Sequence, residues 1–313
     1  MRKKVVGIPK GLLYHYYHPL WESFFGVLGF EVKISPDTNK KIVNNGIMSA
    51  VDEACLPVKV FYGHVLELAE QVDYLFLPRI VSVVEKEYMC PKLLGIPDML
   101  LACLTKPPRV IDTTINLRNS HKQLDQALKE ICTIIEVPLK EGLKAWQAAE
   151  KRQRQYEMYL QSGNLPPGLT FNPRGIPIAV LGHGYNIYDA YINMGMMEKL
   201  HDLGATVWTK EMVAPNIIDN FAGKLPKRMF WTFGKQLLGS GLYYLNNPQV
   251  KGMIFVASFG CGPDSMVGDL LERFAHRGNK KPFMFITIDE HSGEAGLMTR
   301  LEAFMDMIMR RAG

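Results

Sequence analysis

The chain has 313 residues, of which 47% are hydrophobic and 21% charged, and its formal net charge is +5. This composition excludes the collagen-like and intrinsically disordered classes, and no run of about 18 apolar residues without a charge offers a membrane span. Because the first apolar run is too short for a secretory signal, we expect a cytoplasmic protein that binds neither membranes nor nucleic acid. Its five cysteines are then expected to be metal ligands, redox groups or core thiols.

The first third of the chain alternates short apolar runs with helical patterns. This alternation is typical of β-α-β units and predicts a parallel sheet. The expected strands are residues 4–8, 30–34, 74–78 and 109–112, and the expected helices are residues 19–28 and 58–71.

A second α/β series begins after a charge-rich helical stretch over residues 118–163 and a boundary rich in Pro and Gly. Its expected strands are residues 177–182, 205–208, 252–257 and 282–288, and its expected helices are residues 188–203 and 297–311. The sequence therefore predicts an α/β fold with two Rossmann-like, doubly wound domains and mainly parallel sheets. The expected segments are residues 1–117, a helical linker at 118–170, and residues 171–313. Ligands of such sheets bind at the carboxyl ends of the strands.

Three cysteines, Cys55, Cys90 and Cys261, lie in turn-prone sequence, each with a proline one or two positions later. Proline fixes the backbone and stops a helix, and flanking glycine lets backbone N–H groups approach sulfur closely. Thiolates that bind a metal need rigid loops of this kind. Cys103 and Cys132 lie inside apolar helical runs and are expected to be core residues.

Spacing alone leaves the role of the three loop cysteines open. The chain has no Cys-x-x-Cys and no ferredoxin-like cysteine run. An iron–sulfur cluster, a zinc site and plain buried thiols therefore remain alternatives, although structural zinc usually has four ligands in paired spacing.

Motifs spread over nearly the whole chain resemble the 2-hydroxyacyl-CoA dehydratase superfamily. They are most similar to its acyl-CoA dehydratase activase-related branch, whose relatives include double-cubane cluster proteins. The similar stretches are residues 7–13, 19–21, 28–32, 35–39, 52–59, 63–64, 88–92, 289–296 and 299–304.

The resemblance implies a [4Fe–4S] cluster between Rossmann-like domains, with three cysteine ligands and a non-cysteine ligand on the fourth iron. In the double-cubane relatives a sulfide bridges two such clusters, which a pair of subunits would share. Carried onto this chain, the metal ligands are Cys55, Cys90 and Cys261. The implied partners are an ATP-dependent iron–sulfur activase, a second cluster-bearing subunit in a homo- or hetero-oligomer, and a small-molecule substrate, with an acyl-CoA as one option.

The chain itself lacks an actin-like ATPase signature and a G-x-x-x-x-G-K-[ST] loop. We therefore expect it to accept electrons from a separate activase. The hypothesis is an ATP-driven, low-potential reductase or dehydratase-like component. The alternatives are a non-catalytic electron carrier or cluster-assembly scaffold, and a structural zinc protein.

Polar residues close to the loop cysteines and on later strand-end loops are further candidates. Lysines can offset the charge of thiolates or bind a substrate anion, histidine can deliver a proton, and serine can donate to cluster sulfides. Ordinary loop charge, a core histidine and helix capping are the alternatives. The candidate catalytic residues are Glu53, His64, Ser258 and His291, and the candidate cofactor-binding residues are Lys59, Lys92, Gly260 and Gly262.

Overall fold

The computed structural model describes residues 2–120, 123–170, 172–279 and 281–312. The chain divides into two compact units, a first unit of Met1–Tyr156 with Phe230–Thr232 and a second unit of Glu157–Met229 with Phe233–Gly313. Both units consist of helices and parallel strands, which confirms the expected α/β class. The three predicted segments stay a prediction, and residues 121, 122 and 171 of them lie outside the described residues.

The first unit is built on a parallel sheet whose strand order is β2-β1-β3-β5. Val6 of the buried strand β1 pairs with Val32 on one side and Tyr74 on the other. The four strands are β1 (Val5–Ile8), β2 (Glu31–Ile34), β3 (Tyr74–Phe76) and β5 (Arg109–Ile111). All four lie where the sequence predicts strands.

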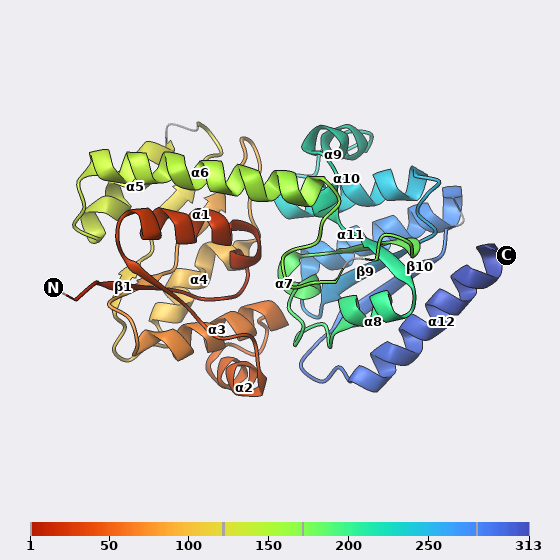
Figure 1. Ribbon diagram of the computed structural model, residues 1–313, viewed down its shortest axis with the longest axis horizontal. Coiled ribbons are helices and arrows are strands. Elements are labelled where there is room, and N and C mark those ends of the chain that lie inside the picture. The colour runs from red at the N-terminus through yellow and green to blue at the C-terminus, as the bar shows by residue number, and fades with distance from the viewer. Residues whose placement is uncertain (1, 121–122, 171, 280, 313) are drawn as a thin grey trace. The chain divides into compact units, whose positions relative to one another are not determined.

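Helices cover both faces of this sheet. In Figure 1, α1 and α6 lie on one side of the sheet and α3 on the other, as expected for a doubly wound unit. Helix α1 begins at Tyr14 rather than at Pro19, so Pro19 lies inside it. The helices are α1 (Tyr14–Val27), α2 (Lys40–Ser49), α3 (Leu56–Ala69), α4 (Pro91–Leu101), α5 (Gln123–Ile134) and α6 (Leu139–Gln161). Two short strands that the sequence analysis missed, β4 (Arg79–Ser82) and β6 (Thr114–Asn116), form a separate small sheet.

The second unit repeats the same strand order. Its parallel sheet runs β8-β7-β9-β10, and strand β9 is buried along its whole length. The strands are β7 (Ile176–Gly182), β8 (Ala205–Trp208), β9 (Gly252–Ser258) and β10 (Phe283–Ile288). The helices are α7 (Gly184–Ile187), α8 (Met196–Asp202), α9 (Pro215–Ala222), α10 (Thr232–Asn246), α11 (Gly262–Phe274) and α12 (Glu294–Ala312).

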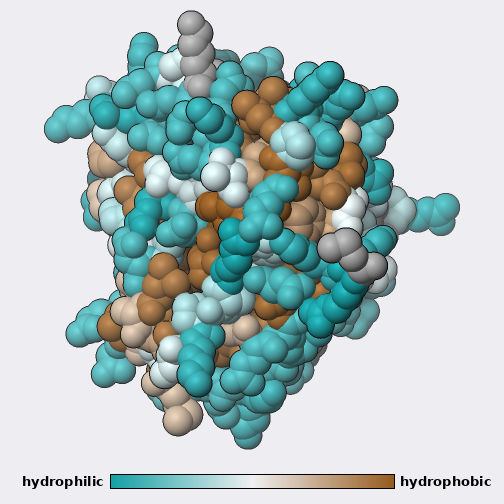
Figure 2. All heavy atoms as spheres, turned by 90° about the vertical axis from the view of Figure 1, so that its left-hand side faces the viewer, coloured by the Kyte–Doolittle hydropathy of each residue, from teal (hydrophilic) through white to brown (hydrophobic). Residues whose placement is uncertain are grey.

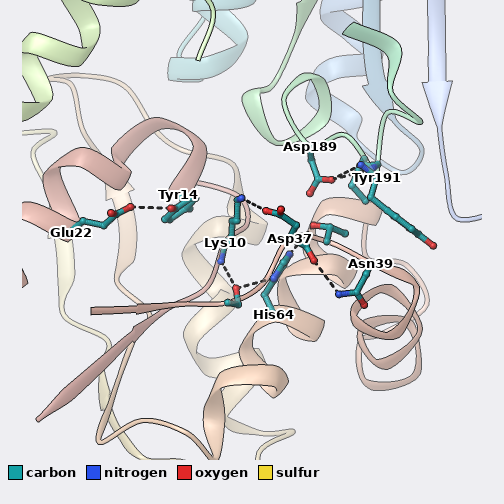
Figure 3. Close-up of polar contacts among 11 residues, drawn as sticks. Lys10, Tyr14, Glu22, Asp37, Asn39, His64, Asp189 and Tyr191 are labelled. Atoms are coloured by element: carbon teal, nitrogen blue, oxygen red, sulfur yellow. Dashed lines mark hydrogen bonds and ion pairs between the residues drawn. The ribbon is translucent and has the colours of Figure 1, made fainter. Parts of the chain in front are cut away.

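The helix expected over residues 188–203 is wrong in its first half. A turn separates α7 from α8, and there Asp189 Oδ1 accepts hydrogen bonds from the N–H groups of Tyr191 and Ile192, each at 3.1 Å (Figure 3). Met194 and Gly195 then take left-handed conformations, with φ of 55° and 69°. An aspartate that bonds its own following backbone competes with helix formation, which the apolar spacing does not reveal.

Each sheet has one point at which the strand order reverses. In the first unit this point lies between β1 and β3, and in the second unit it lies between β7 and β9. Ligands of open α/β sheets bind outside the carboxyl ends of the strands at such points. The fold therefore indicates one place in each unit where a site is expected.

The described part of the chain has no helix that is long and apolar enough to cross a membrane. On the face drawn in Figure 2, hydrophobic atoms lie in several groups between hydrophilic side chains.

Candidate functional site

The three loop cysteines share one local structure. Each is the residue immediately before a helix: Cys55 before α3, Cys90 before α4 and Cys261 before α11. A proline follows each within the first two helical positions, where its missing N–H removes no helical bond. These prolines therefore begin helices, whereas the sequence analysis took them as residues that stop one.

This placement favours thiolate chemistry. The N-terminus of a helix carries partial positive charge and unpaired backbone N–H groups, both of which stabilise an anionic sulfur. The side chains of Cys55, Cys90 and Cys261 are all partly exposed. They therefore differ from Cys132, which is buried in α5, where burial raises the pKa of its thiol. Cys132 is confirmed as a core residue.

Cys103 is exposed and lies beyond the end of α4, so the expectation of a core residue is wrong there. Its Sγ donates to the carbonyl oxygen of Ser49 at 3.4 Å. The apolar run before Cys103 does belong to a helix, but that helix ends at Leu101.

In the first unit, one hydrogen bond joins the two cysteine loops. Lys92, in the first turn of α4, donates from Nζ to the carbonyl oxygen of Glu53 at 2.9 Å. Glu53 lies two residues before Cys55, and its side chain is exposed. The structure therefore brings together two predicted site residues, Glu53 and Lys92. The contact uses the backbone carbonyl of Glu53 and the side-chain ammonium of Lys92.

Lys59 and His64, two further candidates, lie on α3 and are buried. Helix α3 packs closely on α2, because an added Cβ at Gly63 would stand 1.9 Å from the carbonyl oxygen of Ile42. An added Cβ at Gly46 would stand 1.9 Å from the carbonyl oxygen of Lys59. This backbone contact fixes the helix that begins at Cys55.

His64 lies in a polar network behind the loop that follows β2 (Figure 3). Its Nδ1 is 2.9 Å from the hydroxyl of Ser35, and its Nε2 is 2.9 Å from the hydroxyl of Thr38. Burial lowers the pKa of His64 to about 4, with a smaller contribution from the positive charge of Lys10. His64 is therefore a neutral, buried ring with both nitrogens occupied. This geometry favours the core-histidine alternative, and its role in proton delivery stays a prediction.

An apolar pocket lies at the switch point of the first unit. Pro9 follows β1 and Leu77 follows β3, and both line it, together with Phe61 of α3 and Leu93 and Ile96 of α4. Helices α3 and α4 are the two that begin at Cys55 and Cys90. The pocket and the two cysteines are therefore built from the same pair of helices.

The switch point of the second unit carries polar side chains instead. His183 follows β7, and Cys261 and Asp264 follow β9. One ligand atom from each of these three residues lies within 4.8 Å of the other two. The side chain of Asp264 is 1% exposed and that of His183 is 6% exposed. The cluster therefore joins a buried nitrogen donor and a buried carboxylate to a partly exposed sulfur.

Asp264 has an unusual environment for a buried carboxylate. Its Oδ1 lies 2.8 Å from Nε2 of His183. The two groups are not aligned as a hydrogen bond, and neither carboxylate oxygen has a hydrogen-bond partner among the described residues. Burying a charged group without such partners is costly unless a cation or a proton compensates it.

The remaining predicted residues of the second unit surround Cys261. Ser258 is buried at the end of β9, and its hydroxyl donates to Asn186 Oδ1 at 2.8 Å. Gly260 has φ of +76°, which favours glycine, and it turns the chain so that the N–H of Cys261 reaches the Ser258 carbonyl at 3.1 Å. Gly262 occupies the first position of α11.

His291 lies on a different loop of the second unit, the turn after β10. Its side chain is exposed, and its N–H donates to Asp289 Oδ1 at 2.9 Å. Its catalytic role stays a prediction, as do the roles of the other sequence candidates.

The sequence analysis missed His183 and Asp264 as a pair. Two features of the sequence point to them in retrospect: His183 comes directly after a predicted strand, and Asp264 lies one helical turn beyond Cys261. Their proximity depends on the order in which β7 and β9 pair.

Comparison with known families gives a match over residues 5–213, more than half of the chain, to the family described as the CoA enzyme activase uncharacterised domain. The chain belongs to this family. The family agrees with the activase-related branch that the sequence motifs resemble. The matched region contains Cys55, Cys90 and His183, and it ends before Cys261 and Asp264.

No curated protein matches the chain. Three solved structures are similar at low identity. The Ni2+ complex of the binding protein FpvC from P. aeruginosa is 13% identical, covering 100% of this chain and 98% of that one, with a TM-score of 0.28. The Zn(II)-bound ZnuA-like domain of Streptococcus pneumoniae AdcA is 12% identical, covering 97% and 98%, with a TM-score of 0.24.

The third structure, a putative phosphosugar isomerase from Silicibacter pomeroyi DSS-3, is 11% identical, covers 98% of this chain and 85% of that one, and has a TM-score of 0.20. At TM-scores this low, none of the three bears on the site or the ligand of this chain.

Proposed function

We propose that the chain is the iron–sulfur component of a low-potential reductase or dehydratase-like system, which accepts electrons from a separate ATP-dependent activase. The observation that carries the proposal is the shared structure of Cys55, Cys90 and Cys261. Each is partly exposed, each stands before a helix, and each is held by a proline in the first turn. Membership of the CoA enzyme activase family supports the same conclusion.

The donor set fits an iron–sulfur cluster in its chemistry. Iron–sulfur clusters are held by thiolates, and hydrogen bonds to sulfur tune them. Cys55, Cys90 and Cys261 are the proposed ligands, and each stands at the N-terminus of a helix, where the helix dipole favours an anionic sulfur. Lys92 joins the loops of Cys55 and Cys90. When bound, the cluster supplies a low-potential electron, and the residues around it orient the substrate and limit the access of water.

The apolar pocket of the first unit supports an enzyme over a plain electron carrier. A carrier needs no substrate site, whereas this pocket is lined by apolar side chains, among them Phe61 of α3 and Leu93 and Ile96 of α4. We propose that the pocket takes the apolar part of a small-molecule substrate. An acyl-CoA stays one option for that substrate, and a second cluster-bearing subunit stays a proposed partner.

The first experiment measures iron and acid-labile sulfide per chain in anaerobically purified protein. We expect about four irons per chain for a single [4Fe–4S] site, or a clearly larger number with matching sulfide for a double cubane. Cys55→Ala, Cys90→Ala and Cys261→Ala should each lose iron. Cys103→Ala is the matched control, because Cys103 is exposed and does not begin a helix, and it should retain the wild-type content. No iron after anaerobic purification and reconstitution would contradict the proposal.

A second experiment separates an enzyme from a carrier. Leu93→Trp fills the pocket, and Leu139→Trp places the same side chain at a partly exposed site on α6. If the chain is an enzyme, the Leu93 variant should keep its iron and its reduction by the activase but lose substrate-dependent electron consumption. The Leu139 variant should behave as wild type. Equal electron consumption in both variants would favour the carrier.

A further inference from the structure

The second unit contains a set of metal ligands that the cysteine pattern does not include. A ring nitrogen of His183, Sγ of Cys261 and a carboxylate oxygen of Asp264 lie within 4.8 Å of one another. They come from the two central strands of the sheet, at the point where its strand order reverses. We propose that, in the absence of a cluster, this unit binds one divalent transition-metal ion of the Zn2+ class through these three side chains.

A buried carboxylate without a hydrogen-bond partner among the described residues is the independent evidence for a cation. Asp264 is fully buried, and across the described ranges neither of its oxygens accepts a hydrogen bond. Its Oδ1 lies 2.8 Å from Nε2 of His183, which is an ion pair only when the ring is protonated. A metal ion bound to both groups would compensate the carboxylate charge and use the lone pair of the neutral imidazole nitrogen.

The distances between the three ligand atoms fit ligands of a single metal ion better than ligands of different irons in a cluster. With Zn–S bonds of about 2.3 Å and Zn–N bonds of about 2.1 Å, two ligands of one tetrahedral ion stand about 3.6 Å apart. The three ligand atoms lie within 4.8 Å of one another, so side-chain rotation has to bring them closer when an ion binds. Ligands on different irons of a cluster are separated further by the distance between the irons. The close grouping therefore fits one shared ion better than two irons of a cluster.

The chemical kinds of the three ligand atoms indicate which class of metal ion the site would bind. One thiolate, one imidazole and one carboxylate form a mixed set that suits Zn2+ and its neighbours, and not Mg2+ or Ca2+, which prefer all-oxygen sites. Three protein ligands leave a fourth position for water or another small ligand.

Aromatic rings hold His183 in place, and a helix holds Cys261 and Asp264. The His183 ring stacks on Tyr185 with centroids 4.8 Å apart, and Phe233 lies on it at 5.5 Å. Cys261 and Asp264 are held on the first turn of α11, in which Gly268 presses the helix against Phe285 of β10. The ligands therefore come from rigid elements, which favours a preformed site.

The proposal goes beyond the iron–sulfur function. Because Cys261 is also a proposed cluster ligand, the single ion and the cluster compete for it. The site would therefore bind a divalent ion in chains that have not yet received a cluster.

The test uses Co2+ as a spectroscopic probe in the reduced, metal-free, full-length chain. We expect one Co2+ per chain, with a thiolate-to-cobalt charge-transfer band and the visible bands of a four-coordinate ion, all displaced by Zn2+. Cys261→Ser should abolish the charge-transfer band. Asp264→Asn and His183→Asn, which are close to the native shapes, should each weaken binding at least tenfold.

The matched control is the double variant Cys55→Ser with Cys90→Ser, which should leave the cobalt spectrum and stoichiometry unchanged. If that double variant loses the band while Asp264→Asn retains it, the ion is held by the loop cysteines and the proposal is overturned. A folded wild-type chain that binds no Co2+ also overturns it. Neither result decides the iron–sulfur function, which is tested by iron and sulfide content in the cysteine variants.

A stability measurement guards against variants that simply misfold. Asp264→Asn removes a buried charge that has no hydrogen-bond partner among the described residues, so the metal-free variant should have a Tm at least as high as that of the wild type. Zn2+ should then raise the Tm of the wild type and leave that of Asp264→Asn unchanged. An equal Zn2+ effect in both proteins would overturn the proposed role of the carboxylate.

Discussion

The two units have the same strand order but carry different chemistry where that order reverses. Between β1 and β3 the first unit has an apolar pocket, whereas between β7 and β9 the second unit has His183, Cys261 and Asp264. The topology decides where a site lies, and the side chains on the strand-end loops decide what the site can do. The two units therefore present different side chains, apolar in one and metal-ligating in the other, at the same topological position.

The two units also differ in how they fix the helices that begin at cysteines. In the first unit, Gly63 of α3 meets the backbone of α2, and backbone atoms cannot move aside easily. In the second unit, Gly268 of α11 meets the rings of Phe285 and Phe255. Positioning of Cys55 should therefore tolerate less change than positioning of Cys261.

The largest expected effect tests this difference. Gly63→Ala should lower the free energy of unfolding by more than about 3 kcal/mol, because its methyl group overlaps a carbonyl oxygen. Gly268→Ala should cost about 1–3 kcal/mol, because the rings can shift. Chemical denaturation followed by circular dichroism measures both.

Gly26→Ala is the control for this pair. Gly26 lies on the exposed side of α1 with nothing within 4 Å of an added Cβ, so alanine there should stabilise the chain by up to about 1 kcal/mol. If Gly268→Ala proved as costly as Gly63→Ala, the proposed difference between the two units would be wrong.

A second prediction concerns the effect of pH on the first unit, in which His64 is buried. The pKa of His64 is about 4 in the folded chain and has an ordinary value of 6.5. Between these values the unfolded chain binds the proton more readily, so stability should fall as the pH drops from 6.5 to 4. The loss attributable to His64 should be on the order of 3 kcal/mol.

His64→Asn should flatten this pH dependence by about one proton, while it lowers stability at pH 7 through weaker contacts with Ser35 and Thr38. Urea denaturation between pH 4.5 and 7 measures the slope. Substitution of the exposed His291 by Asn should leave the wild-type slope unchanged. A His64 variant with the wild-type slope would show that His64 is not the group that titrates.

The smallest expected effect tests the bond between the two cysteine loops of the first unit. Lys92→Met removes the contact with the Glu53 carbonyl and keeps most of the side-chain volume. It should cost less than about 1 kcal/mol of stability, yet lower the retention of iron during anaerobic gel filtration. Lys41→Met, which removes an exposed ion pair with Glu67, is the control and should retain iron as the wild type does.

Short-range sequence patterns were enough to predict most of the strands and the cysteine loops. The strands at residues 4–8, 30–34, 177–182 and 252–257 are short apolar runs bounded by turns, and each lies where it was expected. The cysteine loops could be recognised because Pro and Gly restrict the backbone over a few residues. The turn at Asp189, the small sheet and the end of α4 before Cys103 were missed, because side-chain to backbone bonds and neighbouring strands decide them.

The sequence by itself determined the α/β class, the strands and the residues of each cysteine loop, since these depend on hydrophobic periodicity and on the conformational limits of Pro and Gly. Only the tertiary structure decided that Cys55, Cys90 and Cys261 each begin a helix, that α3 and α4 share a pocket, and that His183 lies 2.8 Å from Asp264. The physical reason is that these relations join residues up to 81 positions apart, from His183 to Asp264. Strand order brings such residues together, and no local pattern encodes it.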